Sequence, residues 1–238
     1  MKDKFYTSER GVQILISLLK AHGIKKVIAS PGTTNLTFVA SLQQDSFFEM
    51  YSSADERSAA YMACGLAAES GEPVILSCTG ATASRNYIPA LTEAYYRKLQ
   101  ILAVTSTQDI SRIGHLFDQI IDRGAQLNDM VLLSQHIPIV SNEDENWDAT
   151  IKINRALLEL KHRGGGPVHI NLTTSYSKDY STKELPNAKA INRIVQNDIF
   201  PPLPQGRIAI CIGNHKPFSE EQSSIIDAFC ASNNSVVF

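Results

Sequence analysis

A carboxylate that follows a helix-capping residue is the side chain with the clearest chemical potential in this sequence. Glu56 comes directly after Asp55 and precedes a run of small residues at 58–68. Asp55 is a good N-cap, and the helix macrodipole favours a carboxylate in the first turn, so Glu56 could have a purely structural role. Alternatively, a carboxyl group at the end of a strand, beside apolar neighbours, can carry a raised pKa and exchange protons with a ligand.

Two further segments follow apolar strands in the same way as residues 54–57. Ser-Pro-Gly-Thr-Thr occupies 30–34, and Thr-Gly-Ala-Thr-Ala-Ser-Arg-Asn occupies 79–86. In an open α/β sheet, ligands bind outside the carboxyl ends of the strands. Small residues there let the backbone approach a ligand closely. The three segments are therefore the candidate binding turns.

Apolar strands alternate with helical patterns along most of the chain. We expect strands at 26–30, 48–52, 73–78, 99–105, 136–140 and 167–172, and helices at 8–22, from 33 onward, at 56–70, 83–97, 128–134 and 147–162. A polar loop covers about 106–124. This alternation predicts an α/β fold, a parallel β-sheet flanked by helices.

The pattern changes after residue 172, where the first domain, 1–172, is expected to close. Residues 173–205 are rich in Ser, Asn and Pro and predict a linker. Residues 206–238 then start a second α/β domain, with strands at 207–212 and 235–238 around a helix at 220–231. We interpret the sequence as the first part of a longer protein.

Composition excludes several classes of function. The 238 residues are 43% hydrophobic and 19% charged, so the chain is not a disordered tail, and a net charge of −2 argues against a nucleic-acid partner. The four cysteines form no C-x-x-C pair or His/Cys cluster, so we expect no metal ligands. No signal peptide or apolar run of about 20 residues occurs, which predicts a cytoplasmic protein without a membrane partner. The glycine fingerprint of a Rossmann nucleotide binder is missing too.

Three motifs together resemble a known family. They are Ser-Pro-Gly at 30–32, Asp-Glu-Arg-Ser-Ala-Ala at 55–60 and Thr-x-x-Thr-Ala-x-x-Asn-x-x-Pro-Ala-x-x-Glu-Ala at 79–94. Their order and spacing are similar to those of the pyrimidine-binding domain of thiamine-diphosphate enzymes, over residues 8–172. Residues 207 onward resemble the start of the central domain of that family.

The resemblance implies a role for each matching residue. It implies that Glu56 activates the aminopyrimidine of thiamine diphosphate, so that a C2 ylide forms and attacks a 2-oxo acid, as in a decarboxylase or carboligase. It also implies that Gln119 reaches toward the reacting centre. The positions implied to contact the cofactor are Pro31, Gly32, Glu56, Thr79, Thr82 and Asn86.

Within the family, the menaquinone-pathway carboligases are the most similar, and the loop with Ile113-Gly114, Gln119 and Asp122 resembles that of acetolactate synthases. Thr34 and Gln108 stand where those carboligases have arginines that bind substrate carboxylates. Gly80-Ala81 replaces their Ser-Gly, and Arg85 is an additional charge that could serve a different anion. The departures argue against isochorismate as the substrate.

The resemblance also implies cofactors and partners. Thiamine diphosphate would bind with Mg²⁺, but the family's Gly-Asp-Gly diphosphate and magnesium motif does not occur in this sequence. The diphosphate-binding domain of a second subunit would complete the site, which implies at least a homodimer acting on a small-molecule 2-oxo acid. A non-catalytic pyrimidine-type domain, acting as an assembly or regulatory subunit, is the alternative hypothesis.

Overall fold

The computed structural model describes residues 5–123, 126–195, 198–203 and 205–238. The chain divides into two compact units, Met1–Asn192 and Arg193–Phe238, which are described separately. The first unit contains the candidate binding turns.

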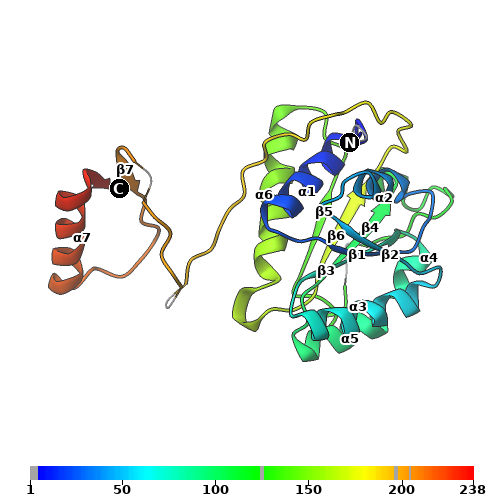
Figure 1. Ribbon diagram of the computed structural model, residues 1–238, viewed down its shortest axis with the longest axis horizontal. Coiled ribbons are helices and arrows are strands. Elements are labelled where there is room, and N and C mark those ends of the chain that lie inside the picture. The colour runs from blue at the N-terminus through cyan, green and yellow to red at the C-terminus, as the bar shows by residue number, and fades with distance from the viewer. Residues whose placement is uncertain (1–4, 124–125, 196–197, 204) are drawn as a thin grey trace. The chain divides into compact units, whose positions relative to one another are not determined.

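A six-stranded sheet forms the centre of the first unit, in the order β2-β1-β3-β4-β6-β5 (Figure 1). Its strands are β1 Lys26–Ala29, β2 Glu49–Ser52, β3 Val74–Thr79, β4 Ile101–Thr107, β5 Leu133–Ile137 and β6 Val168–Thr173. Every neighbouring pair is parallel. The predicted α/β class is therefore confirmed, and the carboxyl ends of all six strands meet at one edge.

Helices cover both faces of the sheet (Figure 1). One face packs against α1 Arg10–Ala21, α2 Leu36–Gln43 and α6 Glu143–Glu159, and the other against α3 Glu56–Ser70 and α5 Ile88–Arg97. Successive side chains of a strand point to opposite faces, so Ile75 belongs to the first core and Leu76 to the second. This two-sided burial explains why β1 and the first half of β3 are rich in Val, Ile and Leu.

The helix expected at 83–97 is divided in two. A single turn, α4 Thr82–Arg85, is followed by α5, which has Pro89 in its first turn. Proline lacks an N–H group, and its ring clashes with the carbonyl group four residues earlier, here that of Arg85. One continuous helix is therefore disfavoured, and Asn86 and Tyr87 form the break.

The helix expected at 128–134 is wrong. Leu133 already belongs to β5, whose residues pair with β6 from Leu133↔Val168 to Ile137↔Leu172. The strand also ends earlier than expected, because Pro138 has no N–H group to continue the ladder.

Two helices start away from their expected positions. α6 begins at Glu143 rather than 147, because the Asn142 side chain accepts a hydrogen bond from Glu145 N at 3.0 Å and caps it there. α2 begins at Leu36, later than residue 33.

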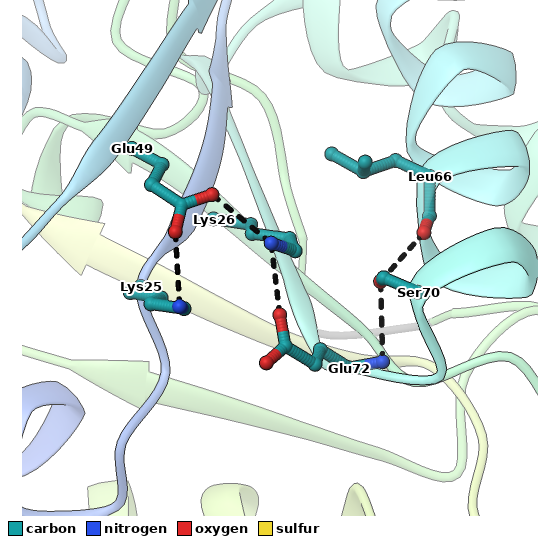
Figure 2. A network of polar contacts seen from close by, with 6 residues as sticks. All are labelled: Lys25, Lys26, Glu49, Leu66, Ser70 and Glu72. Carbon is teal, nitrogen blue, oxygen red and sulfur yellow. Dashed lines mark hydrogen bonds and ion pairs between the residues drawn. The ribbon is translucent and has the colours of Figure 1, made fainter.

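A charged network ties the amino ends of β1, β2 and β3 together (Figure 2). The Lys26 ammonium lies 3.0 Å from Glu49 Oε2 and 2.8 Å from Glu72 Oε2, and Lys25 pairs with Glu49 at 3.0 Å. Hydrogen bonds from Lys26 lower the pKa of both carboxyl groups. The network lies at the edge opposite the candidate binding turns, so we assign it a structural role.

The polar segment after β6 runs along the first unit before the second begins. Tyr6 and Thr182 form an antiparallel bridge, and Leu185, Ala188 and Ala190 pack on the core. In the second unit, β7 Ile208–Ile210 pairs in parallel with β8 Ser235–Val237, and α7 Glu220–Asn233 connects them. Within the described ranges, no helix is long and apolar enough to cross a membrane.

Candidate functional site

Three turns come together at the carboxyl edge of the sheet. They follow β1, β2 and β3, and β1 lies between the other two strands. After β1 the chain forms β2 on one side of it and then β3 on the other side. The strand order therefore reverses at β1. Such a switch point is where open α/β sheets bind ligands.

Glu56 is the first residue of α3, as the sequence predicts. The Asp55 side chain caps the helix by accepting a hydrogen bond from Ser58 N at 2.6 Å, and Gly71 ends it with a φ of 66°. The Glu56 side chain is half-buried, and no described residue donates a hydrogen bond to its carboxylate. Its charge contributes, after burial, to the raised pKa values of Cys78 and Tyr87.

Tyr87 and Cys78 form a buried polar group at the carboxyl end of β3. The Tyr87 side chain is 1% exposed, and its hydroxyl group faces the Ser30 hydroxyl and the Cys78 thiol without good hydrogen-bond geometry to either. Burial raises the pKa of Cys78 to about 12 and that of Tyr87 well above its usual range. Both groups are therefore neutral, and the Tyr87 and Ser30 hydroxyls retain hydrogen-bonding capacity.

Two glycines, Gly32 and Gly80, allow close backbone packing at this edge of the sheet. A Cβ atom on Gly32 would lie 2.2 Å from Cγ2 of Thr79, and one on Gly80 would lie 2.7 Å from the carbonyl oxygen of Ser106. Contacts this short exclude any larger residue unless the neighbours move. The turns after β1 and β3 are therefore packed against each other and against the end of β4.

Thr34 is buried, with only 2% of its surface exposed. Its hydroxyl group donates to the Ser106 carbonyl oxygen at 2.7 Å, and its own carbonyl oxygen accepts from Thr174 Oγ1 at 2.7 Å. Thr34 thus joins the ends of β1, β4 and β6. Gln108 also has a partner, because its Oε1 accepts a hydrogen bond from Arg112 Nη1 at 2.7 Å.

The other sequence-predicted residues are exposed. Pro31 lies at the turn after β1, Thr82 is the first residue of the short α4, and Asn86 follows the end of α4. Gln119 lies in the loop after β4 with a left-handed φ of 56°, and no hydrogen bond joins it to the other candidates among the described residues. The structure thus brings Gly32 and Thr79 into contact and leaves Gln119 apart from them.

The sequence did not single out Tyr87 and Arg123 as site residues. Tyr87 follows Asn86 directly in the third motif, but no spacing rule distinguishes its side chain from an ordinary core tyrosine. Arg123 lies in the polar loop, where arginines are usually solvated. Among the described residues, no group of three His, Cys, Asp or Glu side chains could hold a metal ion.

The first half of the chain matches a known protein family. Residues 9–127 match the family described as "Thiamine pyrophosphate enzyme, N-terminal TPP binding domain". The chain belongs to this family of enzymes.

Curated relatives agree with this assignment. The chain is 35% identical to the 2-succinyl-5-enolpyruvyl-6-hydroxy-3-cyclohexene-1-carboxylate synthase of Bacteroides thetaiotaomicron over 79% of the chain and 34% of that protein. It is 32% identical to the synthase of the same name from Porphyromonas gingivalis, over 99% of the chain and 43% of that protein. The chain thus spans less than half the length of these relatives.

Solved structures show the same fold. The thiamine diphosphate-dependent 4-hydroxybenzoylformate decarboxylase of Rhodococcus jostii RHA1 superposes with a TM-score of 0.59 at 23% identity, covering 77% of this chain and 34% of that one. Benzoylformate decarboxylase from Polynucleobacter necessarius gives a TM-score of 0.59 at 19% identity, covering 79% of this chain and 33% of that one.

The residues at the carboxyl edge fit a flat heteroaromatic ring with polar edges. The half-buried Glu56 carboxylate offers a hydrogen-bonding group that the described part of the chain does not use. An aminopyrimidine presents such ring nitrogens and an amino group, so the edge suits the pyrimidine end of thiamine diphosphate.

Proposed function

We propose that this chain forms the pyrimidine-binding half of a thiamine-diphosphate-dependent 2-oxo-acid decarboxylase or carboligase, with Glu56 as its catalytic acid. The observation that carries the proposal is the position of Glu56. Glu56 is half-buried, it is the first residue of a well-capped helix, and it lies at the switch point of the sheet. The family match supports the choice of cofactor.

The role of Glu56 follows from proton chemistry. The carboxyl group would hold a proton at N1′ of the aminopyrimidine, and the rigid start of α3 would keep that hydrogen bond in place. The neutral Cys78 and Tyr87 put no competing charge on the carboxylate. When bound, thiamine diphosphate supplies a nucleophilic carbon that adds to the carbonyl group of a 2-oxo acid.

The remaining candidates would orient the cofactor or the substrate. Gly32 and Thr79 would form the floor below the pyrimidine, with Pro31, Thr82 and Asn86 at its rim. Gln119 would reach the reacting centre only after the loop after β4 moves, because it is exposed here.

We further propose that the substrates differ from the isochorismate and 2-oxoglutarate pair. Each of those molecules presents carboxylates, which are best held by the planar fork of an arginine. Thr34 is instead a buried link between strands, and Gln108 bonds to Arg112. We expect slow turnover of that pair, and efficient turnover would overturn this part of the proposal.

Assembly completes the proposal. A second subunit of a cytoplasmic homodimer would supply the diphosphate-binding domain, together with Mg²⁺ to neutralise the diphosphate. A non-catalytic assembly role for the domain is less well supported, because the family that the chain matches consists of enzymes.

Steady-state decarboxylation of a panel of 2-oxo acids by the complete enzyme tests the function. Glu56→Gln keeps the size of the side chain but cannot supply the acid, so we expect kcat to fall by orders of magnitude. Glu69→Gln, at an exposed position of the same helix, is the matched control and should leave kcat unchanged. Equal activity of both variants would contradict the proposal.

A further inference from the structure

A layer of polar side chains lies on the sheet beneath the loop that follows β4. His169 of β6 is fully buried, with Nε2 at 2.7 Å from Thr105 Oγ1 and Nδ1 at 2.7 Å from Ser134 Oγ. Thr105 also donates to Asn171 Oδ1 at 3.1 Å. The layer therefore spans β4, β6 and β5, at positions where a sheet between two helix layers is normally apolar.

Arg123 descends from the loop onto this layer. Arg123 is only 6% exposed, and its Nη2 atom lies 3.4 Å from His169 Nε2. The Nε and Nη1 atoms have no hydrogen-bond partner among the described residues. Most native arginines this deeply buried are paired with a carboxylate, because an uncompensated guanidinium is costly to bury.

Among the described residues, no carboxylate is hydrogen-bonded to the Arg123 guanidinium, although Asp122 lines the same cavity. Burial and the neighbouring cation Arg85 lower the pKa of Arg123 to about 10. The pKa of His169 is far below its usual range, also through burial and the proximity of Arg123, so this ring is neutral. A buried water could accept hydrogen bonds from the guanidinium but could not neutralise its charge.

A cavity of about 190 Å³ adjoins Arg123. Ser134, His136 and Asn171 line it together with Arg123, and its remaining walls are Ile110, Ile113 and Asp122. The volume is below the range of about 300–1,000 Å³ that holds drug-sized ligands. The cavity therefore suits a molecule of a few heavy atoms with one polar end and one apolar end.

We propose that this cavity binds a small monocarboxylate, held by the Arg123 guanidinium, with Ser134, His136 and Asn171 as neutral partners and the two isoleucines against its apolar end. A single buried cation matches one negative charge, and the planar guanidinium matches a carboxylate. The lining of this cavity does not include Glu56, Gly32 or Thr79, and its occupation does not require thiamine diphosphate.

Thermal unfolding of the 238-residue chain tests the proposal. Pyruvate, acetate and inorganic phosphate are each compared with sodium chloride at equal ionic strength. A ligand that binds only the folded state raises the melting temperature. We expect pyruvate and acetate to raise it and phosphate to raise it less, since a dianion would need a second desolvated cation.

Arg123→Gln should abolish the carboxylate-dependent rise. In chloride alone this variant should unfold at the same or a higher temperature than the wild type, because it removes the cost of a buried charge. Arg97→Gln removes the same charge from an exposed residue that pairs with Glu93, and it should keep the full rise. An equal rise in Arg123→Gln and the wild type, or no rise in the wild type, would overturn the proposal.

A second variant covers the case in which Arg123→Gln does not fold. Ser134→Ala removes one hydroxyl group from the cavity wall, so we expect at least a tenfold weaker apparent affinity for pyruvate by calorimetric titration. An unchanged affinity in Ser134→Ala would contradict the assigned cavity. Stronger stabilisation by phosphate than by either carboxylate would contradict the assigned class of ligand.

Discussion

Gly32 and Thr79 are in such close contact that a Cβ atom on residue 32 would lie 2.2 Å from Cγ2 of Thr79. The two residues belong to the turns after β1 and β3, which meet where the strand order reverses. Their contact therefore fixes the floor of the candidate cofactor site.

The contact predicts a specific pattern of stability. Gly32→Ala should lower the free energy of unfolding by about 1–3 kcal/mol, as expected for an overpacked position. Thr79→Ser removes the Cγ2 methyl group, so the double variant should recover most of the loss in a double-mutant cycle. Denaturant titrations of the four proteins measure the coupling.

Gly65→Ala is the matched control for that cycle. Gly65 lies inside α3, and a Cβ atom there meets nothing within 4 Å among the described residues. Alanine should stabilise this helix position by about 0.5–1 kcal/mol. A Gly32→Ala variant as stable as wild type would show that the two turns can separate without cost.

Loss of the cap before Glu56 should weaken the start of α3. Asp55→Ala removes the hydrogen bond to Ser58 N, which also lowers the pKa of Asp55. We expect the melting temperature to fall by about 2–4 °C, the usual effect of losing an N-cap in a domain of this size. Asp55→Asn retains the acceptor and should show less than half of that change in a calorimetric scan, whereas equal effects would argue against capping.

Burial of His169 predicts a pH dependence of stability. Its pKa in the folded chain is far below the usual 6.5, so the unfolded chain binds a proton in acid that the folded chain does not. The free energy of unfolding therefore keeps its full value above about pH 6.5. Below that pH it decreases, by at most about 1.4 kcal/mol per pH unit for one such group. Urea titrations from neutral to mildly acidic pH measure the slope.

His169→Gln should make that slope shallower. His115→Gln, in the exposed loop after β4, removes a histidine without changing the buried layer and serves as the control. The same slope in wild type and His169→Gln would show that another group is responsible.

Local signals predict the start of α3 well. The pair Asp55-Glu56, the small residues after it and Gly71 define the helix from Glu56 to Ser70, because the cap and the glycine act within a few residues. The alternation of strands and helices likewise predicts the parallel sheet, because a strand that is buried on both faces has a run of apolar residues.

Tertiary contacts decide what the sequence does not show. Residues 128–134 have a helix-like pattern, but pairing of Leu133 with Val168 of β6 makes that part a strand. Arg123 is polar and belongs to a polar loop, and only the path of that loop over His169 buries it. The sequence shows that Thr34 stands where related carboligases have an arginine. It does not show that Thr34 is buried, because the Thr34 hydroxyl donates to the carbonyl oxygen of Ser106, which is 72 residues away in the chain.

Exchange of the C2 proton of bound thiamine diphosphate with deuterated water tests the role of Glu56 most directly. The measurement reports on activation of the cofactor before any substrate reacts, so it does not depend on knowing the 2-oxo acid. In the complete enzyme, Glu56→Gln should slow the exchange by orders of magnitude with only a modest loss of cofactor affinity, while Glu69→Gln should exchange as the wild type does. Exchange in Glu56→Gln at the wild-type rate, with the cofactor bound, would contradict the account.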